Sequence, residues 1–432
     1  MTIALRMHKT LVRSPQTLSD VVDWRLCIGC GACSYVCKRG KVRMVHVESE
    51  GYRPVFDDPS CADCRDCVEV CPGAQVDGTL EIGGLPTVTE ADREFGPTLE
   101  IWEGWATDPE IRLKASSGGA LSALSLYCIE YGGFHGVVHA GMDPVRPWLN
   151  ENFVSSTREQ VLARAGSRYS PSMPCAALGQ TERGRRYVFV GKPCDVAAVA
   201  AMRRREGAMA ETIGLVLTFF CAGTPSTRGT LDLLEHLQVD PQTVRSLHYR
   251  GAGWPGDFRV ERHDDSGERL RVSYEESWGH LTSYRPLRCN LCPDGLGHVA
   301  DISCGDAWQH YTEDGNPGRS LILVRTEHGR TLLQAAARAG YVTLKRVGSS
   351  EVLRAQSNLL ERRRTLFGRL AAFQLMGVPV PRYKGFWLSH SWLRSGLGRQ
   401  VRSVGGTLRR IARRSWYRRR RQMGTELEAE QS

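Results

Sequence analysis

Cysteine is the residue type in this sequence that points most directly to chemistry. Eight of the 15 cysteines lie in two runs that share the spacing C-x2-C-x2-C-x3-C. The runs are Cys27, Cys30, Cys33 and Cys37, and Cys61, Cys64, Cys67 and Cys71. An odd number of tightly clustered cysteines does not fit the paired disulfides of a small secreted protein. We therefore expect both runs to be metal ligands.

The doubled spacing is the signature of a bacterial ferredoxin module with two 4Fe-4S clusters. Three cysteines of each run hold one cluster, and the fourth reaches the other cluster. The expected ligand sets are Cys27, Cys30, Cys33 and Cys71 for one cluster, and Cys61, Cys64, Cys67 and Cys37 for the other. Zinc is the alternative, because C-x2-C pairs also build tetrahedral zinc sites, but zinc does not require this spacing twice.

Length and composition describe a folded chain with room for several domains. The 432 residues provide for two or three domains. A hydrophobic share of 41% and a charged share of 24% exclude the collagen-like and wholly disordered classes. The N-terminal sequence has no secretion signal, and the longest apolar run, 213–223, is too short to cross a membrane. We expect a cytoplasmic protein without a transmembrane segment.

The elements that must position further chemistry alternate along residues 98–345. Helices are predicted at 121–129 and 196–205, and strands at 136–140, 187–190 and 215–220. This alternation predicts an α/β body within an α+β chain, between a ferredoxin-like two-cluster module and a basic helical tail. The expected domains are residues 1–95 for the two-cluster module, 96–180 and 181–350 for the two parts of the body, and 351–432 for the tail.

Seven segments of the body carry a family resemblance and occur in family order. They are KASSGGALSAL (114–124), GSRY (166–169), FVGKPCDVAA (189–198), FFCAGTPS (219–226), YRGAGWPG (249–256), CNLC (289–292) and DISCGDAW (301–308). The chain resembles the beta subunits of coenzyme F420 hydrogenase and formate dehydrogenase, a family that includes reductases of chlorophyll precursors. The resemblance implies a flavin-binding body that holds FAD. It also implies electron transfer between iron-sulfur clusters and a hydride-accepting organic molecule.

A serine and glycine segment precedes the predicted helix at 121–129. Ser116, Ser117, Gly118 and Gly119 would stand at the amino terminus of this helix, where a phosphate group is favoured. Ordinary capping by serine explains the same residues without a ligand. The family resemblance favours the pyrophosphate of a flavin.

Further residues of the matching segments are expected to line the same cofactor site. Arg168 and Arg250 could pair with phosphate or carboxylate groups, and Trp254 could stack on a planar ring. Tyr169 and Lys192 belong to the same expected site. A turn whose tryptophan fills the core is the alternative for the segment around Trp254.

Four cysteines of the body form a third candidate metal site. Cys194 and Cys221 each follow a predicted strand, and Cys289 and Cys292 form a C-x2-C pair. We expect these four thiolates to hold a third 4Fe-4S cluster close to the flavin, with Lys192 lowering the pKa of Cys194. The alternative for Cys194 and Cys221 is burial as small apolar residues, which is also what we expect for Cys304.

Together these sites predict an oxidoreductase that relays electrons between clusters, FAD and a small-molecule hydride acceptor such as coenzyme F420. A flavin is required because clusters move single electrons, whereas a hydride carries two. The direction of flow is open, and the redox partner would be a ferredoxin or a hydrogenase or dehydrogenase subunit. One alternative is a flavin-dependent reductase of a tetrapyrrole or a sugar intermediate. Another is a non-catalytic electron-transfer subunit docked through its basic tail.

Positive charge is concentrated at the C-terminal end. Residues 362–432 carry 17 lysine and arginine residues against three glutamates, a net charge of +14, within a total of +10 for the chain. Apolar residues recur at helical spacing from Leu397 to Ile411, so residues 382–421 could form a basic amphipathic helix. We expect an anionic membrane surface, at the inner face, or a partner protein rather than nucleic acid as its target. A solvated, disordered tail is the alternative.

Overall fold

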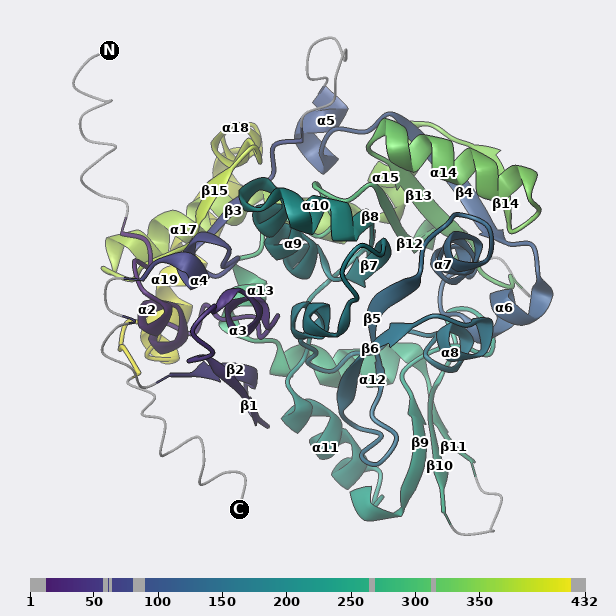
Figure 1. The fold of residues 1–432 in the computed structure, drawn as a ribbon. Coiled ribbons are helices and arrows are strands. Elements are labelled where there is room, and N and C mark those ends of the chain that lie inside the picture. The colour runs from purple at the N-terminus through teal and green to yellow at the C-terminus, as the bar shows by residue number, and fades with distance from the viewer. Residues whose placement is uncertain are drawn as a thin grey trace.

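The computed structural model describes residues 13–56, 61, 64–80, 90–263, 269–311 and 316–420. An eight-stranded mixed sheet forms the centre of the body, in the order β14-β4-β13-β12-β8-β7-β5-β6 (Figure 1). Its strands are β4 (Glu100–Ala106), β5 (Gly136–Met142), β6 (Asn150–Ser155), β7 (Tyr187–Gly191), β8 (Ile213–Phe219), β12 (Ile302–Asp306), β13 (Ser320–Val324) and β14 (Val342–Arg346). Strands from residues 96–180 and 181–350 are interleaved, so both parts build one sheet.

Helices cover both faces of the sheet because its buried strands place successive side chains on opposite sides. In β5, Val137 packs with α7 (Ala120–Glu130) and α14 (Glu327–Arg338), whereas Val138 packs with α9 (Pro193–Arg205). Each helix and strand predicted above between residues 121 and 220 is observed, and only the strand predicted at 215–220 ends one residue earlier, at Phe219. The other α-helices between residues 90 and 212 are α5 (Glu90–Phe95), α6 (Pro109–Lys114), α8 (Arg158–Ala163) and α10 (Gly207–Thr212).

Four neighbouring strands are parallel, and this sets the position of the site. β5 pairs with β7, β7 with β8, and β8 with β12, all in parallel. Their carboxyl ends therefore meet at one edge of the sheet, where α/β proteins bind ligands. A smaller antiparallel sheet and its helices lie beyond this edge, at the bottom of Figure 1. Its elements are α11 (Thr227–His236), β9 (Val244–His248), β10 (Phe258–Arg262), β11 (Arg269–Val272) and α12 (Tyr274–Leu281), and the next helix in the chain, α13 (Leu287–Asn290), lies toward the N-terminal module.

The N-terminal module consists of short elements around the two cysteine runs. They are α2 (Leu18–Asp23), α3 (Ala32–Val36), β1 (Arg43–Val47), β2 (Gly51–Val55), α4 (Asp66–Glu69) and β3 (Gln75–Asp77). Gly29 has a φ of +73°, and a Cβ at this position would lie 2.8 Å from the carbonyl oxygen of Tyr52. The first cysteine loop therefore needs glycine here to pack against β2.

The basic C-terminal region is a folded arm rather than a solvated tail. It contains α15 (Ser349–Ala355), α16 (Ser357–Arg364), α17 (Leu366–Leu375), β15 (Arg382–Lys384), α18 (Leu388–Leu393) and α19 (Leu397–Arg413). β15 pairs in parallel with β3 of the module, and Phe373 and Ile411 complete the core around Cys27 and Cys33. Figure 1 shows α17 and α19 beside the module. The predicted disordered alternative is wrong for residues 362–420, whereas Arg421 lies outside the described residues.

The arm also carries the ion pairs that fasten it to the module. Arg419 Nε lies 2.8 Å from Asp23 Oδ2, and Arg420 Nη1 lies 2.9 Å from Glu50 Oε1. Part of the positive charge of the arm is therefore used within the chain, and so are Val404, Leu408 and Ile411 of the predicted apolar stripe. In the described part of the chain, no helix combines the length and hydropathy that a membrane span needs.

Candidate functional site

The eight cysteines of the module are gathered in two groups. Burial, together with Cys30, Cys27 and Cys71, raises the pKa of Cys33. Burial, together with Cys37, Cys64 and Cys61, raises the pKa of Cys67 to about 12. Most of these electrostatic neighbours belong to the ligand set expected for the same cluster, although Cys67 of the other set also raises the pKa of Cys33. A thiol with such a raised pKa stays protonated by itself, whereas a bound metal centre would displace the proton and stabilise the thiolate.

A third group of cysteines lies at the carboxyl edge of the parallel strands. Burial first, and then Cys289 and Cys292 among its neighbours, raise the pKa of Cys221 to about 12. Cys194 lies in electrostatic range of Cys292 and Cys221. The structure thus brings together the four cysteines that we expected to hold a third cluster. Cys304 is buried and belongs to the apolar core of the sheet, as expected.

Among the residues that the structure describes, no three His, Cys, Asp or Glu side chains converge closely enough to share one metal ion. A cubane cluster has a different requirement, because each of its cysteines binds a different iron.

Two buried contacts connect the module with the third group of cysteines. The Cys175 N–H donates to the carbonyl oxygen of Cys30 at 3.0 Å, and its Sγ lies 3.8 Å from the carbonyl oxygen of Asp195. Arg288 donates from Nη2 to the carbonyl oxygen of Pro72 at 2.9 Å. The charge of Arg288 also acts on three cysteines of the third group. The Cys175 thiol and the Arg288 guanidinium therefore lie between the module and the third group of cysteines.

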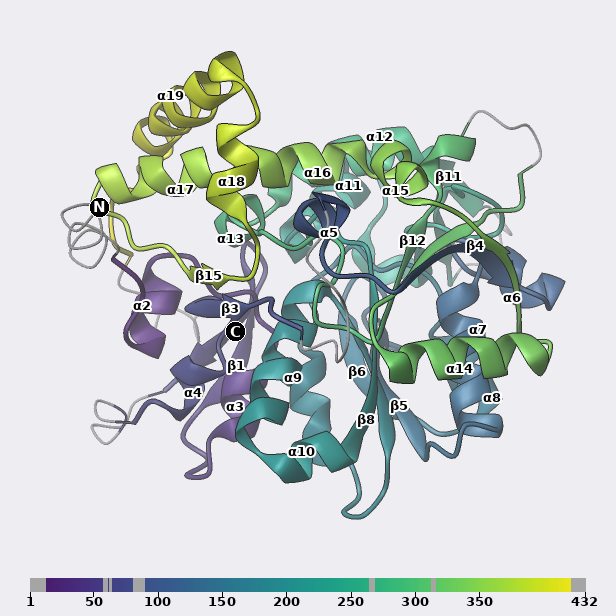
Figure 2. The same ribbon diagram turned by 90° about the horizontal axis from the view of Figure 1, so that it is seen from above.

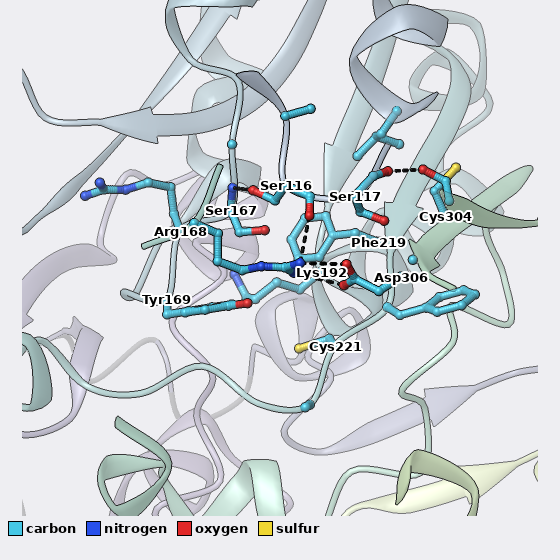
Figure 3. A pocket seen from close by; sticks show the side chains of 18 of the residues that line it. Ser116, Ser117, Ser167, Arg168, Tyr169, Lys192, Phe219, Cys221, Cys304 and Asp306 are labelled. Carbon is cyan, nitrogen blue, oxygen red and sulfur yellow. Dashed lines mark hydrogen bonds and ion pairs between the residues drawn. The ribbon is translucent and has the colours of Figure 1, made fainter. Parts of the chain in front are cut away.

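A cavity of about 720 Å³ opens at the same edge of the sheet. It is lined by the ends of β7, β8 and β12, by the first turn of α7, and by the loop 164–172. Figure 3 shows Ser116, Ser117 and Ser167 on one side and Tyr169 and Cys221 on the other. Cys221 belongs both to this lining and to the third group of cysteines, so the cavity and that group adjoin.

The serine and glycine segment lies where the sequence predicts, at the start of α7. Ser116 Oγ accepts a hydrogen bond of 2.7 Å from the Ser167 N–H, which ties the loop 164–172 to the segment that precedes α7. Ser117 Oγ is buried, lines the cavity and has no hydrogen-bond partner among the described residues. Gly118 and Gly119 have positive φ angles, and a Cβ on Gly118 would lie 2.9 Å from the Ser320 nitrogen. Gly118 therefore allows close packing against β13, whereas Gly119 packs closely against Ala106 and Ile111 and lines the cavity.

The two arginines of the expected site hold protein groups instead of an open anion site. Arg250 is 3% exposed and makes a bidentate ion pair with Asp306, with both contacts between 2.7 and 2.9 Å. It also donates to the carbonyl oxygens of Ser116 and Pro255. Burial alone would lower the pKa of Arg250, but Asp306 raises it above its ordinary value. Arg250 therefore fastens the wall of the cavity.

Arg168 and Trp254 are also engaged with the protein. Arg168 donates to Asn150 Oδ1 and to three backbone carbonyl oxygens. Trp254 donates from Nε1 to Asp306 at 2.7 Å and packs on Trp308, behind the cavity lining. The geometry therefore favours the structural alternative for Trp254 over stacking on a bound ring.

Lys192 is the cation that faces both the cavity and the cysteines. Its Nζ lies 2.7 Å from Asp195 Oδ2 and 2.9 Å from Ser172 Oγ, and the residue is 6% exposed. Burial would lower the pKa of Lys192, but Asp195 and Cys194 raise it, so the ammonium stays charged. Lys192 lowers the pKa of Cys194, as expected, but burial and Asp195 raise it by more, so the net shift of this pKa is upward.

Sequence reasoning missed the aromatic end of the cavity. Tyr274, Trp278, Trp308 and Tyr311 line it, and the rings of Tyr274 and Trp308 stack with centroids 5.4 Å apart. Tyr169, which was expected, packs on Trp278 in the same lining. Trp308 lies in one of the matching segments and could have been singled out, whereas the other three carry no local signal.

Family profiles match most of the body and the module. Residues 26–74 match the 4Fe-4S dicluster domain. Residues 101–179 match the N-terminal part of the coenzyme F420 hydrogenase/dehydrogenase beta subunit, and residues 184–350 match its C-terminal part.

Several proteins of methanogens are similar to this chain. The coenzyme F420 hydrogenase subunit beta of Methanosarcina barkeri is 28% identical over 267 residues, which cover 59% of this chain and 84% of that protein. Its counterpart in Methanothermobacter thermautotrophicus is 26% identical over 301 residues, or 66% of this chain and 99% of that protein. The F420-dependent formate dehydrogenase 1 subunit beta of Methanococcus maripaludis is 27% identical, covering 57% of this chain and 61% of that protein.

One solved structure shares the fold. A chain of the F420-reducing [NiFe] hydrogenase complex from Methanosarcina barkeri superposes with a TM-score of 0.51 at 23% identity. The match covers 64% of this chain and 91% of that chain.

Proposed function

This chain belongs to the coenzyme F420 hydrogenase/dehydrogenase beta-subunit family, and we propose that it relays electrons between 4Fe-4S clusters and an FAD in the cavity. The organic partner of the flavin would be a hydride acceptor such as coenzyme F420. The coarser conclusion, an iron-sulfur protein of an oxidoreductase family, follows from the family matches alone.

The observation that most supports the proposal is the loop between β7 and α9. Lys192 of this loop lines the cavity, and Cys194 belongs to the third group of cysteines. Asp195 of the same turn meets Cys175, which contacts Cys30 of the module. One short segment therefore adjoins the cavity, the third group and the module. Such contiguity is what an electron path through clusters requires.

The residues of the cavity fit a flavin. Ser117 Oγ is an orphaned buried hydroxyl beside the first turn of α7, whose N–H groups have no partners within the helix. A pyrophosphate would satisfy both. Lys192 supplies a fixed cation at the floor of the cavity, and the aromatic end supplies flat apolar walls. When bound, FAD supplies the exchange between one-electron and two-electron chemistry.

The chain's own residues would hold this site rigid and dry. The Arg250–Asp306 pair and the Ser116–Ser167 hydrogen bond, joined through the bond from Arg250 to the Ser116 carbonyl oxygen, fasten the wall of the cavity. Lys192 holds a positive charge beside the third group of cysteines. One hydride corresponds to two electrons and one proton, so two one-electron deliveries and one proton from solvent balance each transfer. The reverse direction uses the same groups.

Metal and flavin content test the proposal first. Protein purified without oxygen should contain about 12 irons, from three cubanes, and one FAD per chain. Dithionite-reduced protein should then bleach oxidised coenzyme F420. About eight irons would remove the third cluster, and a flavin-free protein would favour the non-catalytic electron-transfer subunit. A flavoprotein that leaves F420 unchanged would favour a reductase of another substrate, such as a tetrapyrrole or sugar intermediate.

The partner and membrane expectations also stand as proposals. The relatives from Methanosarcina barkeri and Methanococcus maripaludis bear the names of subunits. By analogy, a ferredoxin or a hydrogenase or dehydrogenase subunit would exchange electrons with the module of this chain.

A further inference from the structure

The apolar stripe of α19 is divided into a buried half and an exposed half. Val404, Leu408 and Ile411 pack on the core that α17 shares with the module. Leu397 and Val401, one turn apart, are 75% and 62% exposed. Packing within the chain therefore accounts for only the C-terminal half of the stripe.

The exposed half extends into the end of α18. Leu393 precedes Leu397 by four residues and is 65% exposed. In Figure 2, α19 stands out from the body beyond α17. Large aliphatic side chains in a row on a protruding helix are costly in water and mark a surface that is covered in use.

A stripe of arginines runs beside these apolar residues. Arg402, Arg409 and Arg413 follow one another at seven and four residues, a spacing that places them on one face of the helix. All three are exposed, and the described residues offer them no ion-pair partner. No acidic residue occurs between Arg362 and Thr425. The helix thus presents an apolar strip next to a purely cationic one.

We propose that α19 and the end of α18 form a docking surface for an anionic lipid membrane. Leu393, Leu397 and Val401 enter the boundary between headgroups and acyl chains, while Arg402, Arg409 and Arg413 contact anionic headgroups. This arrangement is that of an amphipathic helix lying in the membrane plane. Basic residues near an anionic surface add attraction that salt screens.

The charge pattern favours a membrane over a second copy of the chain. A copy would present the same cationic strip to this one, and like charges would face each other across the interface. Only the exposed half of the apolar stripe is free to enter the membrane, so binding also relies on the attraction between the arginines and anionic headgroups. The docking is therefore reversible and dependent on salt. It does not depend on the clusters or the flavin, so it can fail or hold independently of the proposed redox function.

Vesicle co-sedimentation of the full-length holoprotein tests this surface. The wild-type protein should pellet with phosphatidylglycerol/phosphatidylcholine vesicles at low salt, and much less at high salt or with pure phosphatidylcholine. The variant Leu397→Glu/Val401→Glu should lose about tenfold or more of its partition into the anionic vesicles. Its visible cluster absorbance should equal that of the wild type, because both residues are exposed.

The matched control is Leu113→Glu/Val145→Glu, which makes the same change of charge at two other exposed aliphatic residues. This control should pellet within about twofold of the wild type. The proposal is overturned if the wild type does not pellet with anionic vesicles at low salt. It is also overturned if both variants pellet alike, or if pure phosphatidylcholine binds the wild type equally well.

Discussion

Replacing Arg250 with methionine tests whether this arginine holds the cavity wall or a ligand phosphate. The change removes the bidentate pair with Asp306 and the hydrogen bonds to two carbonyl oxygens. It also leaves the Asp306 carboxylate nearly buried without its cation, at 14% exposure. Breaking such a pair costs about 3–5 kcal/mol. At about 2 °C per kcal/mol for a large domain, the apparent Tm should fall by about 6–10 °C.

The assay is thermal unfolding of anaerobic holoprotein for the wild type and three variants. Arg250→Met/Asp306→Asn should be more stable than Arg250→Met, because it removes the uncompensated buried charge. Arg245→Met is the control, since its pair with Glu261 is exposed at the arginine and should be worth less than about 1 kcal/mol. Arg250→Met should weaken riboflavin and FAD binding alike. An unchanged Tm, or a loss confined to FAD, would refute the wall role and restore the phosphate role.

Three further predictions concern the cysteines and the cations beside them. Cys289→Ser/Cys292→Ser should lower the iron content from about 12 to about eight per chain, whereas Cys128→Ser should lose none; equal losses would contradict the third ligand set. Lys192→Met should raise the FAD dissociation constant by about tenfold or more in a fluorescence titration, and Lys192→Arg should retain most of the affinity. An unchanged constant would place Lys192 outside the flavin site. Arg288→Met should make the reduction potential of the third cluster more negative in an EPR titration, because a buried cation that favours the reduced cluster is gone. Unchanged potentials would show that Arg288 serves only the hydrogen bond to Pro72.

The sequence predicts what depends on local spacing. The cysteine runs, the loop that carries Lys192 and Cys194, and the start of α7 at Ser116 are all readable because neighbours in the chain define them. Their grouping in space follows from parallel strands, whose carboxyl ends meet at one edge.

Contacts between distant residues are not readable in this way. Arg250 and Asp306 are 56 residues apart, and Arg288 and Pro72 are 216 apart, so neither pair leaves a local pattern. In the sequence alone, where Asp306 cannot be recognised as its partner, Arg250 in a cofactor-like segment suggests a phosphate ligand. The same limit applies to the C-terminal arm. The periodicity of α19 predicts a helix, but it does not predict that Ile411 is buried and Leu397 exposed.

The relay itself is tested most directly by EPR spectroscopy after adding reduced coenzyme F420 to oxidised, anaerobic holoprotein. The proposed function predicts reduced-cluster signals in the flavin-loaded protein and none in the same protein stripped of flavin. Signals that are absent from the loaded protein, or equally strong without flavin, would contradict electron transfer through a flavin in the cavity.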